Sequence, residues 1–313
     1  MIVTELYNGQ GLGNQLWCYF VTRSIAENLG FDFGIDSKFR FKGGGFIDLD
    51  FGKEVKGGYS PEGGPPNKLP EGVEFYYREI VSLHPSSKIN ISRKDHNMCL
   101  IHDNTKIDGC MQSLEYLDLE KVKSWISIDP QKNIQDYSDN NICVIHIRGG
   151  DFKGSSAFLD NDYFRKAEKI MISRNPNMKF VVVTDDILYA RSIFPNYPIV
   201  GGSSTSEPDD KKASHHIGGP VWMDWTILYN AKNIIISSSS FSFWPAILNL
   251  NSPFVIAPMF WGDYKNSDGY WSCWEMIVDQ WFYLDRFGNL KSSSDCLFKR
   301  DEYLVNNPTL YGI

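Results

Sequence analysis

The sequence of 313 residues contains no stretch of about 18 consecutive apolar residues, which is the length that a membrane-spanning helix requires. Its beginning, MIVTELYNGQGLGNQ, also lacks the basic start and the apolar core of a secretory signal peptide. We therefore expect a cytoplasmic protein. A peripheral association with a membrane surface stays open on these grounds.

Positive charge is also scarce. Lys and Arg number 31 against 38 Asp and Glu, which gives a formal net charge of −7 and an isoelectric point near 5.4. Nucleic acids and anionic membranes are bound through clustered Lys and Arg, so this balance argues against a nucleic-acid partner. Any phosphate group that the chain binds must be held locally by a few donors.

Patterns typical of metal sites are missing as well. The six cysteines include neither a Cys-x-x-Cys pair nor the Cys/His spacing of a zinc site, so we expect reduced thiols. Three polar pairs lack the spacing of a metal site, namely Asp185-Asp186, Asp209-Asp210 and His215-His216. The sequence therefore predicts no metal and no cofactor.

In other respects the composition is that of a globular protein, with 42% hydrophobic and 22% charged residues. The length suffices for two cores of about 150 residues each. Aromatic residues are the one excess, at 14%. Aromatic faces pack in ordinary cores and also suit sugars and bases, so the excess is compatible with such a ligand without proving one.

The N-terminal region begins with a strand, a glycine-rich loop and a helix. An apolar run at Ile2–Leu6 predicts the strand, Gly9–Gln15 the loop, and helical spacing at residues 16–29 the helix. A second strand is expected at residues 31–35, ending at Asp36. This βαβ start predicts a parallel sheet that binds ligands at the carboxyl ends of its strands.

The C-terminal half alternates strands and helices. Strands are expected at residues 142–148, 179–184 and 233–237, and helices at 162–174, 222–230 and 243–250. This alternation predicts a Rossmann-like domain and an α/β fold class. We divide the chain into an N-terminal domain (1–138), a C-terminal Rossmann-like domain (139–290) and a tail that packs back (291–313). Frequent Gly and Pro predict a long irregular loop at residues 42–72.

Small residues dominate the loop after the first strand, where Gly11 and Gly13 allow the backbone to approach a ligand or a helix closely. Asn14, at the expected start of the helix, can cap that helix or donate its amide to a ligand. The loop matches neither the GxGxxG dinucleotide fingerprint nor the GxxxxGK[ST] phosphate loop. NAD-dependent and ATP-dependent chemistry are thereby disfavoured, and a simple capped turn stays an alternative.

The segment HIRGGD at residues 146–151 follows an apolar strand. Strand alternation places the side chains of His146 and Arg148 on the same side. An arginine at the carboxyl end of a strand, beside a glycine turn, can hold a diphosphate through bidentate, charge-assisted hydrogen bonds. Asp151 could pin the turn or the guanidinium. An ion pair between Arg148 and Asp151 that only closes the turn is equally compatible with the sequence.

A serine-rich run, SSSSFSFW at residues 237–244, lies between an expected strand and an expected helix. Hydroxyl and N–H groups at a helix N-terminus can bind an anion without a metal, although a single serine cap is the simpler interpretation. Four consecutive serines exceed what a cap needs. Asp224, near the start of the preceding helix, is either a helix-start carboxylate or a group that reads the edge of a purine base.

Taken together, three segments resemble the α-1,2-fucosyltransferases of glycosyltransferase family 11. They are GLGNQ at residues 11–15, HIRGGD at 146–151, and the stretch that runs from Asp224 to SSFSFWPA at 239–246. The family pattern reads GLGNQ, then HxRRxD, then an STFSWW-like run after an Asp-led helix. In this chain Gly149 replaces the second basic residue, Ser240 the threonine and Phe243 the first tryptophan.

The resemblance implies a GT-B-like architecture, in which two Rossmann-like domains face each other across a cleft and the C-terminal domain binds the donor. The implied donor substrate is GDP-β-L-fucose. The implied reaction is a single inverting, metal-independent displacement that forms an α-1,2 linkage to a hydroxyl of a glycan, expected to end in galactose.

The resemblance also implies a role for individual residues. Arg148 would hold the leaving β-phosphate, and Asn14 would reach the diphosphate or the fucose from the N-terminal half. The remaining donor-binding residues implied are Gly11, Gly13, His146 (by the ribose or base), Asp151, Asp224 (by the guanine), Ser239, Ser240, Phe241 and Ser242. Asp36 is the candidate general base, by its position at the end of the second strand.

Two alternatives remain open at this point. The same diphosphate site would serve another GDP-sugar, such as GDP-mannose, and the aromatic excess would also suit a non-catalytic carbohydrate-binding protein. A neutral glycan, however, gives no reason to place Arg148 beside a serine-rich helix start. The sequence does not indicate the oligomeric state.

Overall fold

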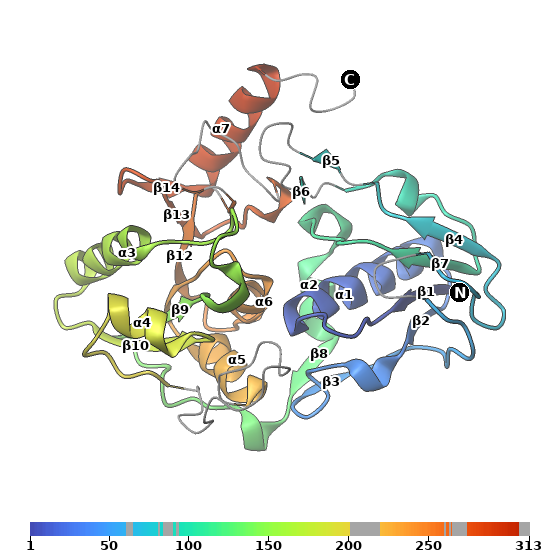
Figure 1. Cartoon of the computed structure of the whole chain (residues 1–313), viewed down its shortest axis with the longest axis horizontal. Coiled ribbons are helices and arrows are strands. Elements are labelled where there is room, and N and C mark those ends of the chain that lie inside the picture. The colour runs from blue at the N-terminus through green and yellow to red at the C-terminus, as the bar shows by residue number, and fades with distance from the viewer. Residues whose placement is uncertain are drawn as a thin grey trace. The chain divides into compact units, whose positions relative to one another are not determined.

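The computed structural model describes residues 1–60, 65–80, 82–83, 90–91, 94–200, 220–259, 261–262, 264 and 274–306. These residues form two compact units, which Figure 1 colours from blue at the N-terminus to red at the C-terminus. The first unit contains the described residues up to 83, those from 90 to 129, and 274–276, and the second contains the other described residues. Each unit has its own sheet, parallel throughout in the first and parallel except for one pair in the second, so the expected α/β class is confirmed.

The first unit is built on a four-stranded sheet of order β2-β1-β7-β4, in which every neighbouring pair is parallel. The strands are β1 (Ile2–Glu5), β2 (Phe33–Asp36), β4 (Phe75–Arg78) and β7 (Thr105–Asp108). The parallel pairing of β1 with β2 confirms the predicted βαβ start. Because all four strands run in one direction, their carboxyl ends meet at the same edge of the sheet.

Helix α1 (Leu12–Leu29) connects β1 to β2, and it ends at Gly30 in the left-handed conformation that glycine adopts without strain. Its N-cap is Gly11 in an extended conformation, without a side-chain cap. The expected loop through Gln15 is therefore wrong, as is a cap at Asn14, which lies within the first turn. Glycine tolerates the N-cap conformation, so the helix begins four residues before the apolar stripe indicates.

Short elements complete the first unit. Strand β3 (Ile47–Leu49) pairs with β8 (Ile126–Ile128), β5 (Ser82–Leu83) pairs with β6 (Asn90–Ile91), both pairs antiparallel, and α2 (Leu119–Ser124) precedes β8. The irregular loop expected at residues 42–72 therefore contains a strand, because Ile47 and Leu49 are buried on either side of exposed Asp48. Residues 61–64 lie outside the described part of the chain.

The second unit contains a six-stranded sheet of order β10-β9-β11-β12-β13-β14, parallel except for the β13–β14 pair. The strands are β9 (Ile142–Ile147), β10 (Lys179–Thr184), β11 (Asn233–Ile235), β12 (Phe254–Pro258), β13 (Phe282–Leu284) and β14 (Leu290–Ser292). The helices are α3 (Asn161–Arg174), α4 (Ile187–Ile193), α5 (Val221–Asn230), α6 (Ser240–Leu248) and α7 (Ser293–Asn306). The three expected strand–helix units are confirmed.

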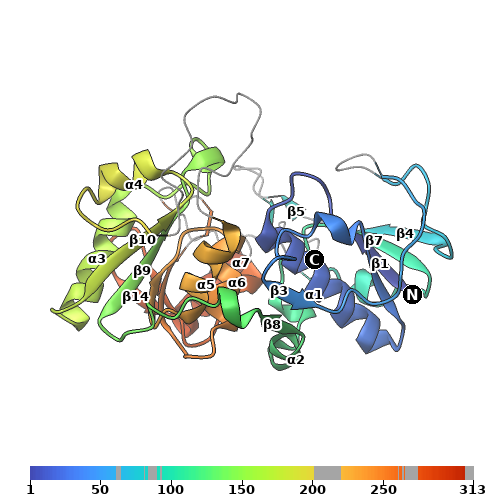
Figure 2. The same ribbon diagram turned by 90° about the horizontal axis from the view of Figure 1, so that it is seen from below.

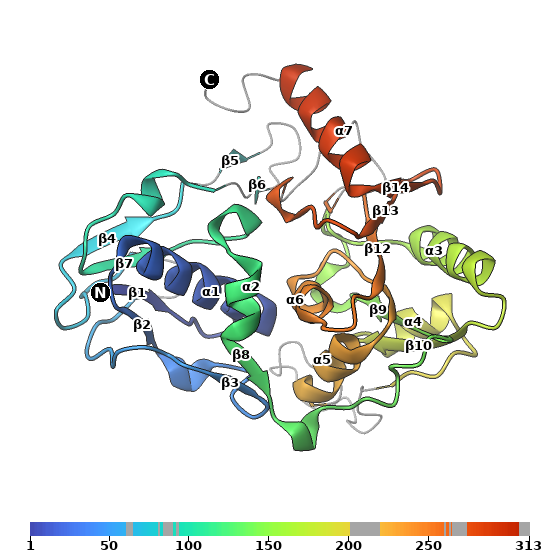
Figure 3. The same ribbon diagram turned by 180° about the vertical axis from the view of Figure 1, so that it is seen from behind.

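Two groups of helices cover the two faces of this sheet. Figure 2 shows α3 and α4 on one side of β9 and β10, with α5 and α6 on the other, and Figure 3 shows α5 beside α6. Alternate residues of β9, Cys143, Ile145 and Ile147, pack with α3 and α4 in one apolar core. The intervening residues, including His146, therefore lie on the face that α5 and α6 cover.

Helix α6 begins at Ser240 rather than at Phe243, because Ser239 adopts an extended conformation and caps it. Ile199 forms an isolated parallel bridge with Val182. Residues 201–219, which include the Asp209-Asp210 and His215-His216 pairs, lie outside the described part of the chain. Within that part, no helix combines the length and the apolarity needed to cross a bilayer.

Candidate functional site

Three neighbouring parallel strands of the second unit bring polar residues to one edge of the sheet. Strand β9 lies between β10 and β11. Arg148 directly follows β9, Asp185 directly follows β10, and Ser237 lies two residues beyond the end of β11. Ligands of α/β sheets bind outside the carboxyl ends of the strands. This edge is therefore the place in the second unit where a substrate site is expected.

Arg148 is held between two carboxylates. Its Nη2 lies 2.7 Å from Asp151 Oδ1 and its Nη1 lies 2.9 Å from Asp185 Oδ2, while the guanidinium carbon lies 5.0 Å from the ring centroid of Phe152. The Arg148 side chain is 20% exposed, and its Nε is buried without a hydrogen-bond partner. The ion pair with Asp151 that the sequence allows is present, and it leaves part of the guanidinium available to a ligand.

Gly149 and Gly150 make this turn possible, because a Cβ at either position would lie too close to a neighbouring aspartate. The N–H of Gly149 donates to Asp185 Oδ1 at 2.8 Å, and a Cβ on Gly149 would lie only 2.5 Å from the Cβ of Asp186. Asp186 caps α4 and pairs with Lys153 at 2.5 Å. Asp185 and Asp186 thus contact cations and backbone N–H groups of the chain itself. In the described residues, no group of three His, Cys, Asp or Glu side chains is arranged to hold a metal ion.

His146 is buried on the α5/α6 face of the sheet, and its Nδ1 lies 2.7 Å from Ser237 Oγ. The ring centroid of Phe241 lies 5.8 Å from that of the imidazole. Burial, reinforced by the positive charge of Arg148, lowers the pKa of His146 to about 3. The imidazole is therefore neutral at physiological pH and can act as a hydrogen-bonding group but not as a counter-ion for phosphate.

The serine-rich run divides into separate functions. Ser239 accepts the N–H of Phe241 at 3.3 Å as the N-cap of α6, and Ser242 donates its hydroxyl to the carbonyl of Ser239 at 3.1 Å. Ser240 is the first residue of the helix. Ser238 differs from these residues, because its hydroxyl oxygen is buried and has no hydrogen-bond partner. The expected cap by a single serine is therefore present at Ser239. The buried Ser238 hydroxyl takes no part in that cap, and no group in the described part of the chain satisfies it.

Asp224 lies in the first turn of α5 and is only 8% exposed. Pro220 occupies the N-cap position and Asp224 is the acidic residue of the first turn, so the interpretation of Asp224 as a helix-start carboxylate is confirmed. One carboxylate oxygen, Oδ1, is buried without a hydrogen-bond partner. Burial, with a further contribution from the negative charge of Asp185, raises the pKa of Asp224 to about 8, so this carboxyl holds a proton at neutral pH.

The other sequence-predicted residues belong to the first unit. Gly11 and Gly13 lie at the start of α1, and Asn14 Oδ1 accepts a hydrogen bond from Gln112 Nε2 at 3.2 Å. Asp36 ends β2, half-buried, and burial together with nearby Glu5 raises the pKa of its carboxyl. A raised pKa makes this carboxylate a stronger base, which is compatible with the predicted role.

Three buried polar atoms without partners therefore belong to one connected set of residues in the second unit: Arg148 Nε, Asp224 Oδ1 and Ser238 Oγ. Arg148 pairs with Asp185, which also acts electrostatically on Asp224, and Ser238 follows the partner of His146. Buried polar groups are normally satisfied, so such a concentration indicates a polar ligand.

Sequence reasoning did not assign Asp185 to this site, and within the serine-rich run it singled out residues 239–242 rather than Ser237 and Ser238. A signal for each was present, because all three follow apolar strands of the predicted parallel sheet. Neighbouring strands of such a sheet bring their carboxyl ends together.

Comparison with known proteins places this site within a matched segment. A model of the family described as Glycosyl transferase family 11 matches residues 121–284. The O-antigen biosynthesis glycosyltransferase WbnK of Escherichia coli is 27% identical over 154 residues. That match covers 46% of this chain and 45% of WbnK, so less than half of the curated relative's length is spanned.

Two solved structures are also similar to this chain. The NodZ alpha-1,6-fucosyltransferase co-crystallized with GDP is 13% identical, with a TM-score of 0.45 over 93% of this chain and 96% of that one. The fucosyltransferase NodZ from Bradyrhizobium is 14% identical, with a TM-score of 0.42 over 79% of this chain and 92% of that one.

Proposed function

Because the chain belongs to glycosyl transferase family 11, we propose that it transfers L-fucose from GDP-β-L-fucose to a hydroxyl of a glycan. The proposed reaction forms an α-1,2 linkage with inversion at the anomeric carbon and requires no metal. The proposed acceptor ends in galactose. The donor occupies the second unit, at the carboxyl ends of β9, β10 and β11.

The observation that carries this proposal is the set of unsatisfied polar groups around Arg148. A diphosphate offers acceptor oxygens to Arg148 Nε and to the Ser238 hydroxyl, and the first turn of α6 adds its N–H groups and its positive dipole end. A neutral glycan alone would leave a guanidinium at this edge without a function. The geometry therefore supports a nucleoside diphosphate as the ligand.

The chemistry follows from where charge develops. The acceptor oxygen attacks the anomeric carbon of fucose, the bond from that carbon to the β-phosphate oxygen breaks, and GDP leaves with the electron pair. Negative charge on the β-phosphate grows during this step, and Arg148 is placed to stabilise it. Asp151 and Asp185 hold the guanidinium in position, so little reorganisation is required.

His146 and Asp224 are the proposed nucleoside contacts. The buried, neutral His146 offers a hydrogen bond to the ribose or the base. The edge of guanine presents two N–H donors, which an ionised carboxylate accepts together. Asp224 is therefore expected to lose its proton when guanine binds, which couples GDP affinity to pH.

From the first unit, Asn14 is proposed to contact the diphosphate or the fucose, with Gly11 and Gly13 allowing a close approach of the backbone. The acceptor hydroxyl must give up a proton as it attacks. Asp36 is the proposed proton acceptor, because its raised pKa strengthens it as a base.

The test is a calorimetric titration of the protein with GDP, UDP and NAD in the presence of EDTA. We expect GDP to bind, UDP and NAD to bind more weakly, and Arg148→Ala to abolish GDP binding. Transfer from GDP-fucose by Arg148→Ala should fall by about a hundredfold or more, as for loss of a charged transition-state donor. Parallel reactions with GDP-mannose test whether the protein uses that GDP-sugar as its donor instead of GDP-fucose.

Arg165→Ala is the matched control, because Arg165 also pairs with a carboxylate three residues on and lies over a phenylalanine ring. Both variants lose an ion pair and a ring contact, yet only Arg148→Ala should lose the ability to bind GDP. A folded wild-type protein that fails to bind GDP, or an Arg148→Ala variant with near wild-type transfer, would contradict the proposal.

A further inference from the structure

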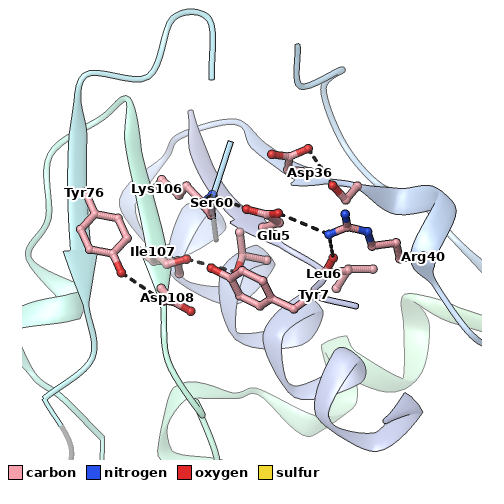
Figure 4. Close-up of polar contacts among 12 residues, drawn as sticks. Glu5, Leu6, Tyr7, Asp36, Arg40, Ser60, Tyr76, Lys106, Ile107 and Asp108 are labelled. Atoms are coloured by element: carbon pink, nitrogen blue, oxygen red, sulfur yellow. Dashed lines mark hydrogen bonds and ion pairs between the residues drawn. The ribbon is translucent and has the colours of Figure 1, made fainter. Parts of the chain in front are cut away.

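The carboxyl-end edge of the first unit's sheet carries a carboxylate at each of its four strands. They are Glu5 of β1, Asp36 of β2, Asp108 of β7, and Glu79, which directly follows β4. Figure 4 shows the first three with their polar contacts. The family match begins at residue 121, so it includes none of the four.

Glu5 and Asp108 have side-chain partners, which Figure 4 shows. Glu5 Oε2 lies 2.5 Å from the Nζ of Lys106, which is fully buried, and Glu5 Oε1 lies 3.5 Å from Arg40 Nη1. Asp108 accepts the Tyr76 hydroxyl at 3.0 Å. These contacts satisfy both carboxylates within the protein, so their role is structural.

Glu79 instead binds the backbone of the loop that follows β7. Its side chain is buried, its Oε2 accepts the N–H of Met111 at 2.7 Å, and its carboxylate also accepts the N–H of Cys110. Gly109 permits this close approach, because a Cβ there would lie 2.5 Å from the Cβ of Glu79. Two successive N–H groups directed at one carboxylate form an anion-binding turn, which a side chain of the protein itself occupies here.

Met111 is the strained residue of this turn. Its φ is +54°, in the left-handed region that a bulky side chain rarely adopts, and its side chain is fully buried. Such a conformation persists only where the surrounding contacts determine it. The hydrogen bond from the Met111 N–H to Glu79 is one of these contacts, and an ionised acceptor makes it stronger than a bond between neutral groups.

The next residue of the loop contacts Asn14. Gln112 Nε2 donates to Asn14 Oδ1 at 3.2 Å. Because Oδ1 accepts this bond, the Nδ2 group of the Asn14 amide faces away from Gln112. This is the orientation that Asn14 needs in order to donate to a phosphate or fucose oxygen. The loop therefore connects the carboxylate of Glu79 to the orientation of the Asn14 amide.

We propose that Glu79 is a positioning residue, whose carboxylate fixes the strained turn at residues 110–111 so that Gln112 orients Asn14 for transfer. The inference rests on the proposed transferase function, in which Asn14 contacts the diphosphate or the fucose. The proposed GDP contacts at Arg148 and Asp224 belong to the second unit. Loss of the Glu79 charge should therefore slow transfer without weakening GDP binding.

The charge of Glu79 changes near neutral pH, because burial raises the pKa of its carboxyl to about 7 although three hydrogen bonds oppose the shift. Four side chains interact electrostatically with it, and each is an acid rather than a cation: Asp95, Tyr116, Tyr77 and Cys18. A protonated carboxyl holds the Met111 N–H less strongly than a carboxylate does. The kcat should therefore fall as the pH decreases through about 7.

The experiment measures kcat at saturating GDP-fucose from pH 5.5 to 8.5, together with the GDP dissociation constant, for wild type, Glu79→Gln, Gln112→Ala and the double variant. Saturation removes the pH dependence of donor binding through Asp224. Wild-type kcat should fall roughly tenfold from pH 8 to pH 6, since the ionised fraction of a group with a pKa near 7 changes by that factor.

Both single variants should have a lower kcat at pH 8 and should lose this pH dependence, with GDP affinity unchanged within about twofold. The double variant should be no slower than the slower single variant, because both changes interrupt the same connection. The raised pKa of Asp36 could produce a similar pH dependence, but that dependence would survive in both variants. Gln112 is only half-buried, so Gln112→Ala tests the connection even if Glu79→Gln does not fold.

Glu168→Gln is the matched control. Glu168 of α3 is also buried, and its carboxylate accepts the hydroxyl of Tyr197 as that of Glu79 accepts the hydroxyl of Tyr116. The variant removes a buried carboxylate of the second unit without altering the loop after β7. Its kcat and its pH dependence should therefore match those of wild type.

The outcomes separate the two proposals. A wild-type protein that neither binds GDP nor transfers fucose overturns the proposed function and, with it, this inference. If transfer occurs, two results overturn the inference alone: a wild-type kcat that does not change between pH 6 and pH 8, or a Gln112→Ala variant that keeps the wild-type kcat and pH dependence.

Discussion

At the scale of single residues, burial decides which groups of the site carry charge. His146 is neutral because its pKa is lowered to about 3, and Asp224 is protonated because its pKa is raised to about 8. Arg148 contributes the positive charge of a planar guanidinium. The site thus has one permanent cation and one carboxyl whose charge a ligand can change.

Asp224→Asn tests whether Asp224 is protonated in the folded protein. Two quantities report on this, the free energy of unfolding and the affinity for GDP. The carboxyl pKa rises from 3.8 to about 8 on folding, so between these values the folded chain holds a proton that the unfolded chain has lost. Wild-type stability should therefore fall as pH rises through that window. An asparagine side chain cannot ionise, so the variant should be more stable at pH 8.5 by the order of a few kcal/mol, since a pKa change of one is worth about 1.4 kcal/mol. Urea unfolding at pH 5.5 and 8.5 measures the difference.

The same variant should lose GDP affinity and the rise of that affinity between pH 6 and 8.5. Glu79→Gln is the comparison, because burial raises the pKa of Glu79 to about 7 and its carboxylate accepts the N–H of Met111 at 2.7 Å. Glu79→Gln should reduce the loss of stability at high pH without changing GDP affinity. Equal GDP binding by Asp224→Asn and wild type at every pH would remove Asp224 from the site.

At the scale of elements, the sequence predicted strands more accurately than helix starts. Strand β10 agrees with the prediction, and β9 ends one residue earlier than predicted, because apolar runs and alternation are local properties. Both α1 and α6 begin three or four residues early, because Gly11 and Ser239 act as N-caps. Glycine and serine were assigned to loops, where their intrinsic preferences place them, although the first turn of a helix accepts both.

The contacts of the site were less predictable than its strands. Asp185 pairs with Arg148 across 37 positions of the chain, and Asp108 meets Tyr76 across 32. Such pairs depend on which strands become neighbours, and a single sequence does not state that order. The region that contains β4 and β7 offered no recognisable motif, so the contacts of Glu79 and Asp108 were not foreseen.

The turn after β9 gives a prediction at this scale. In Gly149→Ala the new Cβ would lie 2.5 Å from the Cβ of Asp186, and the turn must move. We expect a loss of about 1–3 kcal/mol in unfolding free energy, typical of overpacking, and weaker GDP binding because Arg148 moves with the turn. Gly44→Ala is the control, since its Cβ meets its nearest neighbour at an ordinary 3.5 Å. Thermal unfolding and calorimetry of both variants provide the measurement, and an unaltered GDP affinity for Gly149→Ala would contradict the expected displacement.

At the scale of the whole molecule, the chain divides into two compact units, each with its own sheet. The residues proposed to bind the donor at Arg148 and Asp224 belong to the second unit, and Asp36, the proposed proton acceptor, belongs to the first. Separate cores favour separate unfolding steps, because two-state behaviour is a property of single domains.

Scanning calorimetry should therefore resolve two transitions, and GDP should raise the transition of the second unit more than that of the first. A ligand at a hundred times its dissociation constant adds about 2.7 kcal/mol to the unit that binds it. Arg148→Ala should remove this shift while leaving both transitions in place. One transition that moves as a whole with GDP would show that the units unfold together.

The ion pair between Glu5 and Lys106 also constrains how this sequence can diverge. It joins β1 to β7 across 101 positions of the chain, with both side chains buried. Losing either partner alone leaves an uncompensated charge and costs about 3–5 kcal/mol, whereas an apolar pair of similar volume can be nearly neutral. A substitution of Glu5 is therefore expected to be tolerated only together with a substitution of Lys106, because the form with one partner alone is the least stable.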